Sequence, residues 1–398
     1  MNKLVITRWN GAILTAVIAD GVPIQLEIEP EGERSILGNI YIGKVKNIVK
    51  NINAAFVDIG NHVTGYLSLE STEVRLSNGL KPEGRLKAGD EIIVQVERDA
   101  VKTKDPVLTG NLNFTGRYCV LTSGKCQIGF SSKITDNGWK KRVKPLIEAH
   151  KDEDFGMIVR TNAPEVSDEK LITELEALKQ LYRQTVEGAA YRTCYSLLYE
   201  NPPAYVSGVR DSLHGTLETI LTDERDIYDS LLAYLTRSQP WDLEKLAFYE
   251  DDLLPLSKLY HIEKALEDSL SKRVWLKSGG YLVIEPTEAL TVIDVNTGKY
   301  AGKKTLRDTI MKINSEAAVE IGRQLRLRNL SGIIIIDFID MAEEEDKKRL
   351  MEVLTGVVSK DPVKTNVVEI TKLNLVEITR KKIRRPLYEQ VAQVKEKA

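Results

Sequence analysis

Two apolar segments with a long helical pattern between them constrain the fold of this chain more than any other feature. The first reads ALTVIDVN over residues 289–296, and the second reads SGIIIID over residues 331–337. A strand, a helix and a strand in this order predict a right-handed crossover between two parallel strands. The unbroken isoleucine run favours a strand that is covered on both faces. The helix is predicted from apolar residues three or four positions apart, which are Leu306, Ile310, Ile313, Ala317, Ile321 and Leu325.

Both apolar segments end in an aspartate, Asp294 in the first and Asp337 in the second. Ligands of such sheets bind beyond the carboxyl ends of the strands, so the two carboxylates are expected side by side there. Asn296 follows two positions after Asp294 and therefore lies on the same strand face. Adjacent carboxylates repel each other, and a hard divalent cation removes the conflict. The pattern predicts a Mg²⁺ site at Asp294 and Asp337, with phosphodiester hydrolysis as its chemistry.

Asp340 lies three positions beyond Asp337, so it does not share that face if the strand continues. We expect it to support the metal ligands from behind or to cap the next turn. A different interpretation makes Asp337 a turn cap and Asp294 the start of a loop. The residue pattern alone leaves the metal site and this structural interpretation both open.

The charge is nearly balanced, so a polyanionic partner requires local basic patches. The 398 residues include 56 Lys and Arg and 58 Asp and Glu, a net charge of −2, which provides no global field to attract nucleic acid. A charged helix face is usually just solvated, so it indicates nucleic-acid binding only beside the paired aspartates. The candidate basic residues around the helical pattern are Lys299, Lys303, Lys304, Arg307, Arg323, Arg326 and Arg328.

Cysteine usage and hydropathy predict a cytoplasmic protein with no membrane span. Cys119, Cys126 and Cys194 include no C-x-x-C pair, which fits a reducing compartment. The first residues read as strand, turn and strand rather than as a signal peptide. No apolar run reaches the length needed to cross a bilayer.

The first third of the chain predicts short strands. From residue 36 to residue 112, five short strands separated by turn residues favour a small closed barrel. Phe56 and Tyr66 fall in neighbouring strands, where exposed rings could stack on unpaired bases. The competing interpretation is that both rings belong to the barrel core. Lys44, Lys46 and Lys104 are candidate contacts to phosphates.

Longer segments resemble the ribonuclease E/G family of bacterial endoribonucleases. The resemblance rests on GNIYIGKV, AAFVDIG, GDEIIVQV, IVRT, TEALTVIDVNTG, EIGRQLRLRNLSGIIIIDFIDM and VEITR, in that order over almost the whole chain. It implies a mixed α/β (α+β) multidomain fold. The implied parts are a ribonuclease H-like subdomain (1–35 and 201–270), an inserted OB-fold barrel (36–112), a 5′-sensor subdomain (113–200), a DNase I-like catalytic subdomain (271–390) and a tail (391–398).

The resemblance also implies roles for single residues. In the family, the aspartates matching Asp294 and Asp337 hold the catalytic Mg²⁺, and the asparagine matching Asn296 orients the first aspartate. Arginine forms forked bonds to phosphate, which suits a 5′-end sensor. The implied RNA contacts are Phe56, Tyr66, Lys104 and Lys364, and the implied 5′-phosphate contacts are Arg160 and Thr161.

Two departures from the family pattern modify these expectations. Relatives continue into a C-P-x-C-x-G-x-G segment whose cysteines share zinc between subunits, whereas this sequence closes with LYEQVAQVKEKA. A homo-oligomer is therefore possible, but a zinc-linked dimer is not expected. A segment that is often SRR in relatives reads FSSK at residues 130–133, which leaves the strength of 5′-end sensing open.

The expected function is Mg²⁺-dependent endonucleolytic cleavage of single-stranded RNA, stimulated by a 5′-monophosphate, in RNA maturation or decay. One alternative is a non-catalytic RNA-binding protein that uses only the barrel and the sensor. Another is a metal-dependent DNA nuclease, against which the barrel's suitability for single-stranded RNA argues.

Overall fold

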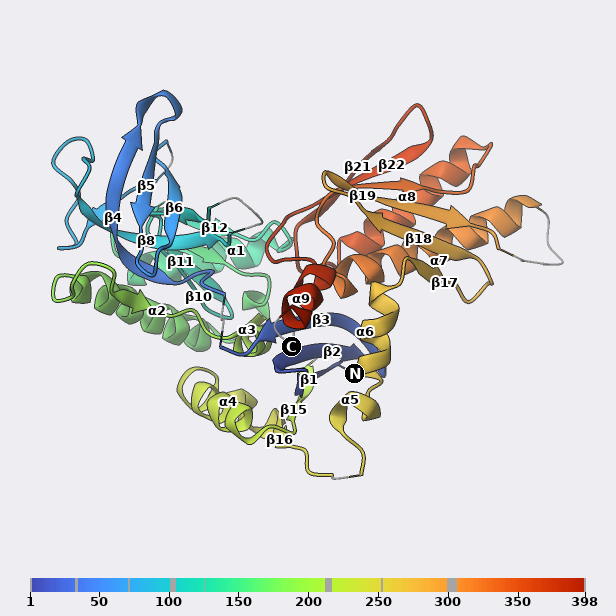
Figure 1. The fold of residues 1–398 in the computed structure, drawn as a ribbon, viewed down its shortest axis with the longest axis horizontal. Coiled ribbons are helices and arrows are strands. Elements are labelled where there is room, and N and C mark those ends of the chain that lie inside the picture. Colours follow the sequence, from blue (N-terminus) through green and yellow to red (C-terminus); the bar gives the residue numbers. More distant parts are fainter. Residues whose placement is uncertain are drawn as a thin grey trace. The chain divides into compact units, whose positions relative to one another are not determined.

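The computed structural model describes residues 2–32, 35–70, 72–100, 105–124, 126–211, 217–251, 253–298 and 306–396. Contacts divide the chain into two compact units (Figure 1). The first unit consists of residues 1–33 and 215–398, and the second unit consists of residues 34–214. The mixed α/β multidomain class is confirmed, because both units combine sheets with helices. The finer division into functional subdomains stays a prediction.

The first sheet of the first unit joins distant parts of the chain. Its strand order is β16-β15-β1-β2-β3, in which β1, β2 and β3 form antiparallel hairpins while β15 and β16 run parallel to β1. The hairpin turns are left-handed at Asn10 and Asp20, each followed by a glycine, which is the two-residue turn chemistry that matches strand twist. The strands are β1 (Asn2–Trp9), β2 (Ala12–Ala19), β3 (Val22–Pro30), β15 (Leu217–Thr222) and β16 (Leu246–Phe248).

Five helical segments accompany this sheet. Leu256, Ile262, Leu266 and Leu387 join Val5, Leu14 and Leu26 in one buried core. The helices are α4 (Arg225–Ser238), the 3-10 helix η3 (Pro240–Lys245), α5 (Leu256–Leu259), α6 (Ile262–Leu270) and α9 (Leu387–Lys395).

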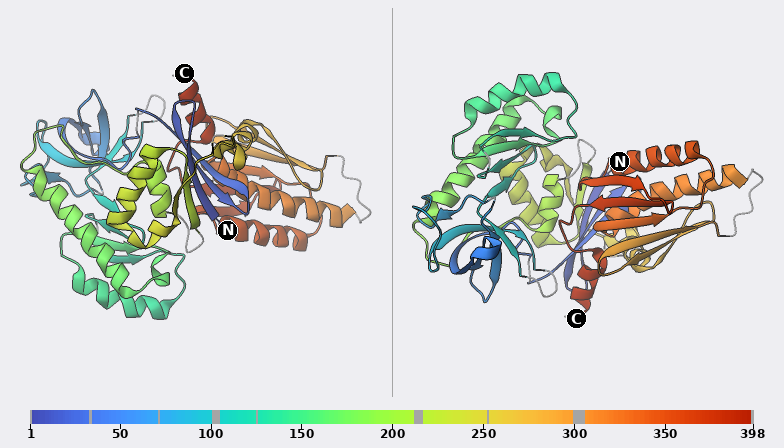
Figure 2. Two further views of the ribbon diagram at one scale, coloured as in Figure 1. Left: turned by 90° about the horizontal axis from the view of Figure 1, so that it is seen from below. Right: turned by 90° about the horizontal axis from the view of Figure 1, so that it is seen from above.

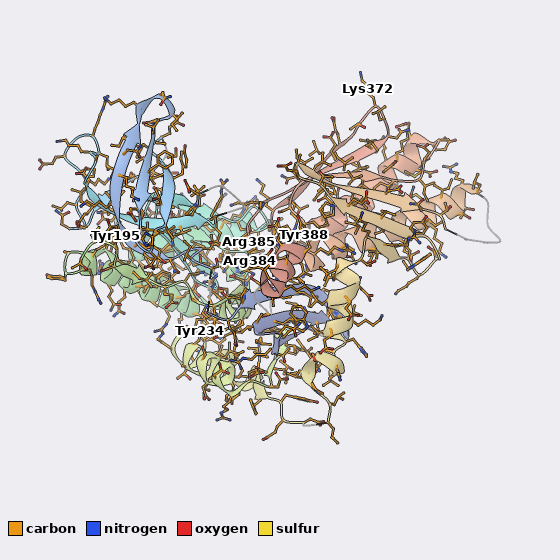
Figure 3. All side chains as sticks on the ribbon, in the orientation of Figure 1. Tyr195, Tyr234, Lys372, Arg384, Arg385 and Tyr388 are labelled. Atoms are coloured by element: carbon orange, nitrogen blue, oxygen red, sulfur yellow. The ribbon has the colours of Figure 1, made fainter. Side chains whose placement is uncertain are left out.

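The first part of the segment expected to be a tail (391–398) is helical. Helix α9 continues to Lys395, because Val391 and Val394 pack into the core against β3. The side chain of Gln390 accepts a hydrogen bond of 2.8 Å from the backbone of Ile28. Figure 3 labels Arg384 and Arg385 just before this helix, and Arg384 forms an ion pair with Glu27 of β3.

The second sheet of the first unit has the order β17-β18-β19-β20-β22-β21. Helix α7 connects β19 to β20, which pair in parallel as predicted, and α8 follows β20. Helices α7 and α8 lie on one face of this sheet (Figure 2). Their side chains pack with that face to form the core. The elements are β17 (Arg273–Trp275), β18 (Tyr281–Pro286), β19 (Leu290–Asn296), α7 (Leu306–Leu327), β20 (Gly332–Asp337), α8 (Glu344–Val358), β21 (Thr365–Ile370) and β22 (Leu375–Arg380).

The prediction that β20 is covered on both faces is wrong. Ile334 and Ile336 are fully buried in the core with α7 and α8. Ile333, on the opposite face, is 50% exposed, and Val292 of β19 is exposed beside it. We call this second side the open face of the sheet. Alternating burial is usual for a sheet that has helices on one side.

The second unit contains the predicted closed barrel. Strands β4, β5, β6, β9 and β8 pair in sequence, and β4 also pairs with β8, which closes the ring. Ala55, Val57, Leu67, Ile92 and Val94 fill its interior. The elements are β4 (Ile40–Val49), η1 (Lys50–Ile52), β5 (Ala54–Asp58), β6 (Thr64–Ser68), β7 (Arg75–Leu76), β8 (Glu91–Arg98), β9 (Val107–Thr109) and β14 (Leu197–Tyr199).

A four-stranded sheet with the order β10-β11-β13-β12 completes the second unit. The side chain of Ser167 caps α2 by accepting from the backbone N–H of Lys170, and Asp136 caps α1 through Trp139. The elements are β10 (Asn113–Thr115), β11 (Cys119–Thr122), β12 (Ile128–Phe130), α1 (Asn137–His150), β13 (Gly156–Val159), η2 (Ala163–Glu165), α2 (Asp168–Ala189) and α3 (Ala204–Asp211). Across the described ranges, no helix is long and apolar enough to cross a bilayer.

Candidate active site and RNA-binding surfaces

Asp294 and Asp337 are register partners at the carboxyl ends of two parallel strands. The pairing runs from Leu290 with Ile333 to Asp294 with Asp337. Both side chains therefore lie on the open face, because Ile293 and Ile336 point into the core. The strand spacing of about 4.8 Å brings their backbones together without any loop in between. The structure thus brings together the two aspartates predicted from the sequence.

Asn296 is attached to this pair by a hydrogen bond. Its Nδ2 amide donates to Oδ2 of Asp294 over 2.6 Å. The Oδ1 atom of Asp294 has no protein partner within the described part of the chain. The amide therefore orients one carboxylate oxygen, and no described residue bonds to the other, which a ligand can use.

Glycines allow the turn before β18 to approach the end of β19. A Cβ atom on Gly298 would lie 2.2 Å from the carbonyl oxygen of Gly279, and one on Gly280 would lie 2.8 Å from that of Asn296. Gly298 also has a φ of +60°, which an L side chain rarely adopts. The backbone around Asn296 is consequently held in place by close packing that only glycine permits.

The electrostatics of the carboxylate pair are unfavourable without a cation. Partial burial, the charge of Asp294 and the charge of Asp340, in that order, raise the pKa of Asp337 above its ordinary value. Asp340 is exposed, and its Oδ1 accepts a hydrogen bond of 3.4 Å from Asn374. Asp340 therefore contributes charge near Asp337 while its own contact is to the β21–β22 loop.

The donor set fits Mg²⁺ better than a cation held entirely by protein ligands. Within the described ranges, no group of three or more His, Cys, Asp or Glu side chains is arranged to hold a metal. Mg²⁺ typically uses one or two carboxylates and keeps waters or substrate phosphates as its other ligands. Asp294 and Asp337 supply that number of carboxylates on an accessible sheet face.

Phe56 and Tyr66 lie on the outer surface of the barrel and not in its core. They are direct cross-strand partners on β5 and β6, with ring centroids 6.1 Å apart at an angle of 75°. Their strand neighbours Ala55 and Leu67 fill the interior. Both rings are half-buried, so each keeps an accessible surface. Lys104, the predicted phosphate contact, lies outside the described residues.

Lysines accompany this aromatic pair on the outer barrel surface. Lys44 is paired with Asp58 in the strand register, two residues along β5 from Phe56. The Lys46 ammonium forms an ion pair of 3.1 Å with Asp58 and donates to Thr64 over 3.0 Å. Aromatic rings beside basic side chains are the usual composition of a surface that binds single-stranded nucleic acid.

Arg160 and Thr161 follow β13 in the second unit. The Nη1 group of Arg160 donates to the carbonyl oxygen of Gly116 over 2.5 Å and to Oδ1 of Asp211 over 2.7 Å. Within the described part of the chain, its Nε and Nη2 groups have no protein partner. Thr161 Oγ1 is 3.0 Å from the hydroxyl of Ser131. The guanidinium is thus anchored through one nitrogen, and its remaining donors are available for a bidentate bond to an anion.

Sequence reasoning did not identify Asp211, which anchors Arg160. Burial alone would raise the pKa of Asp211, but the charges of Arg210 and Arg160 outweigh that effect and lower it. Asp211 is therefore held as a carboxylate between two arginines. It ends α3, far from Arg160 in the chain, so no local pattern could have indicated the contact.

Lys364 is not brought to the aspartate pair. It precedes β21, whose first residue Thr365 pairs with Arg380, and Arg380 pairs with Gly332 at the start of β20. Asp337 ends the same strand, about 17 Å away at 3.3 Å per residue. Lys364 is exposed at that opposite end of the sheet.

The prediction of an exposed basic face on α7 is wrong for the second half of the helix. Lys299, Lys303 and Lys304 lie outside the described residues. Arg323 pairs with Glu320 over 2.6 Å. Arg328 is buried, donates to Gln324 over 2.6 Å, and burial lowers its pKa to about 10. Arg323 and Arg328 bond to side chains of α7 itself, so they do not form a free surface for a polyanion.

Comparison with known proteins agrees with this architecture. The Ribonuclease E/G family model matches residues 113–383, and the S1 RNA binding domain model matches residues 35–109, which contain the barrel. The chain is 36% identical to Ribonuclease G of Haemophilus influenzae over 94% of this chain and 78% of that protein. It is also 36% identical to Ribonuclease G of Escherichia coli K12, over 93% and 77% respectively. Ribonuclease E of a Nostoc species is 34% identical over 89% of this chain and 52% of that protein. The chain therefore belongs to the ribonuclease E/G family of endoribonucleases.

Proposed function

We propose that this endoribonuclease cleaves single-stranded RNA with a Mg²⁺ ion bound at Asp294 and Asp337, and that a 5′-monophosphate on the RNA stimulates cleavage. The direct register pairing of the two aspartates on adjacent parallel strands carries the proposal. A raised pKa at Asp337, caused by burial and neighbouring carboxylates, supports it because a bound cation relieves that conflict.

The protein's own contribution is to position oxygen ligands. Asp294 and Asp337 are fixed by the β-ladder, and Asn296 holds one oxygen of Asp294. Bound there, Mg²⁺ would supply a more acidic water and neutralise charge on the phosphate. In the hydrolysis, a water oxygen would bond to phosphorus and the bond from phosphorus to the 3′-oxygen would break. The 3′-oxygen would take up a proton, so the products would carry a 3′-hydroxyl and a 5′-phosphate. The open face offers the RNA access to this site, since α7 and α8 pack on the opposite face and Ile333 is 50% exposed.

Binding of the RNA strand is assigned to the outer barrel surface. Phe56 and Tyr66 offer ring faces for stacking, and Lys44 and Lys46 offer positive charge next to them. Stacking of this kind tolerates most sequences, because every base has a π face. The barrel therefore suits an enzyme that selects single strands more than particular bases.

Recognition of the 5′-end is assigned to Arg160 and Thr161. Arg160 has donors free for a forked bond to a terminal phosphate, and the Thr161 hydroxyl lies beside it in the chain. Asp211 keeps the guanidinium in place. A triphosphate brings more charge and bulk than a monophosphate, and a 5′-hydroxyl brings no charge for Arg160 to bind.

One assay tests both parts of the proposal. The purified chain is given Mg²⁺ and matched single-stranded RNAs that carry a 5′-monophosphate, a 5′-triphosphate or a 5′-hydroxyl, together with a DNA of the same sequence. We expect internal cleavage of RNA, fastest for the monophosphate, and little cleavage of DNA. RNA that is bound but never cut would favour a non-catalytic RNA-binding protein. Equal cleavage of all three RNAs would contradict only the proposal that Arg160 and Thr161 sense the 5′-end.

A further inference from the structure

Two aromatic residues share the open sheet face with the carboxylate pair. Asn296 of β19 pairs directly with Tyr281 of β18, and Tyr281 pairs directly with Trp275 of β17. In the neighbouring register row, Asp294 pairs with Val283, and Val283 pairs with Arg273. The residues between these two rows, Leu282 and Val295, point into the core on the other side. All of these positions belong to the first unit.

The side chains of this row form a compact aromatic group. The rings of Trp275 and Tyr281 have centroids 5.3 Å apart and are tilted by 60°. The guanidinium of Arg273 lies 4.6 Å from the Tyr281 ring centroid and 5.7 Å from the Trp275 ring centroid. Trp275 is nevertheless 64% exposed. Single exposed rings are common on protein surfaces, so the exposure of Trp275 matters here because the ring belongs to a group on the face that carries the carboxylates.

The position of the group relative to the carboxylates follows from the strand register. Neighbouring strands are about 4.8 Å apart, so Tyr281 is one strand and Trp275 two strands, roughly 10 Å, from Asn296. A phosphate bound at Asp294 and Asp337 would therefore have an adjacent nucleotide within reach of these rings. On the other side of the carboxylates, β22 places Leu375 opposite Asp337 and Glu377 opposite Ile335, and neither β22 residue is aromatic.

The charge around the group suits a nucleic-acid strand. Within the described ranges, no carboxylate pairs with Arg273, so its charge is available to a phosphate. Arg273, Trp275 and Val283 also line a cavity of about 1250 Å³. Its lining includes two further cations, of which Lys264 is paired with Asp268 over 3.8 Å and Lys272 with Glu285 over 2.9 Å. An aromatic platform with adjoining cations is the arrangement by which single-stranded nucleic acid is held.

We propose that Trp275 and Tyr281, supported by Arg273, form a base-stacking subsite that holds a nucleotide adjacent to the bond cleaved at Asp294 and Asp337. This inference rests on the proposed function, because it places the cleaved bond at the aspartate pair. The subsite acts on one side of the cleaved bond only. It contributes through the face of the base, so it accepts any of the four bases.

A purely structural role for the same residues makes a different prediction. Cross-strand aromatic pairs stabilise hairpins, and the β17–β18 hairpin turns tightly at Gly279 and Gly280. If stabilisation were the only role, replacing Trp275 would lower the melting temperature. It would then affect all RNA substrates equally, whatever base lies beside the cleaved bond.

Abasic substitution separates these roles. The substrate is a 5′-monophosphorylated single-stranded RNA with one cleavage site, prepared as a series in which one nucleotide at a time lacks its base. With the unmodified chain, we expect kcat/KM to fall on the order of tenfold at one position next to the cleaved bond. With Trp275→Ala, kcat/KM on the intact RNA is expected to fall by a similar factor, mainly through a higher KM. The abasic change at that position should then lower kcat/KM no further. Trp275→Phe keeps a stacking ring and should restore most of the position dependence.

The controls keep folding and catalysis apart from stacking. Tyr191→Ala removes another exposed ring, 90% accessible at the end of α2, and should leave the abasic profile unchanged. Circular dichroism and melting curves establish whether each variant is folded. Asp337→Asn measures binding of the same abasic series without cleavage.

Each outcome decides one claim. If cleavage is normal but the losses caused by Trp275→Ala and by the abasic change are additive in free energy at every position, the subsite proposal is overturned. The nuclease proposal then stands. If the unmodified chain does not cleave RNA, but binding to Asp337→Asn still depends on which nucleotide lacks its base, the nuclease proposal is overturned. The subsite is then supported as an RNA contact.

Discussion

Asp294 and Asp337 are paired directly across β19 and β20, although a 22-residue helix separates the two strands in the chain. The ladder fixes their backbones, so neither side chain can move away from the other by a simple loop shift. This pairing creates charge repulsion that only a cation or a proton removes.

The first prediction concerns stability without metal. Asp337→Asn should melt at a slightly higher temperature than the unmodified chain in EDTA at neutral pH, because the substitution removes the repulsion. Mg²⁺ should raise the melting temperature of the unmodified chain, since a ligand that binds only the folded state stabilises it. The same addition should leave Asp337→Asn nearly unchanged. Equal stabilisation of both proteins by Mg²⁺ would place the ion elsewhere.

The second prediction concerns the 5′-end. Arg160→Lys keeps the positive charge but loses the fork that binds phosphate through two N–H groups. The ratio of cleavage rates for 5′-monophosphate and 5′-hydroxyl RNA should fall about tenfold, as expected for one charge-assisted hydrogen bond. The rate on the 5′-hydroxyl RNA should stay the same. A drop on both substrates would indicate damage to the fold, which a melting curve would reveal.

The third prediction concerns the barrel surface. Phe56→Ala and Tyr66→Ala should each weaken RNA binding by about 1–3 kcal/mol, the usual contribution of one base stacked on an aromatic ring. Stability should fall less than for a core ring such as Phe114, which is fully buried. Fluorescence anisotropy with labelled single-stranded RNA measures the binding loss. Full RNA affinity in both variants would show that the strand binds another surface.

The fourth prediction concerns the buried ion pair between Asp361 and Arg380, whose side chains are 4% and 3% exposed. Asp361→Ala should destabilise the fold by about 3–5 kcal/mol, because it leaves the guanidinium buried without its partner. The surface pair of Arg225 and Asp229 provides the matched control. Asp229→Ala should cost less than about 1 kcal/mol. Chemical denaturation measures both values, and similar losses would contradict this account.

The sequence predicted the centre of the site because its signals were local. Apolar runs, helical spacing and the crossover rule together place Asp294 beside Asp337, and the alternation of a strand places Asn296 on the same face. The family resemblance then distinguished a metal site from a pair of turn caps. The five-strand closed barrel was predicted for the same reason.

Other features depended on contacts that no local pattern encodes. The isoleucine run of β20 reads the same whether one or both faces are covered, and the structure covers one. The arginines of α7 resemble a solvated basic face, but tertiary packing buries Arg328 and pairs Arg323. Asp211, at the end of α3, contacts Arg160, which follows β13, only because the fold brings these two distant segments together. The row from Asn296 to Trp275 required the strand register as well as the hairpin turn at Gly279.

Cleavage and binding measured on the same variants test the central claim most directly. Asp294→Asn and Asp337→Asn are each compared with the unmodified chain and with Asp229→Asn, using a 5′-monophosphorylated single-stranded RNA in Mg²⁺. The account predicts that the first two variants lose cleavage by about a thousandfold or more, the scale of lost metal-assisted charge stabilisation, while RNA affinity changes little. Undiminished cleavage by both variants would contradict the assignment of the active site to this aspartate pair.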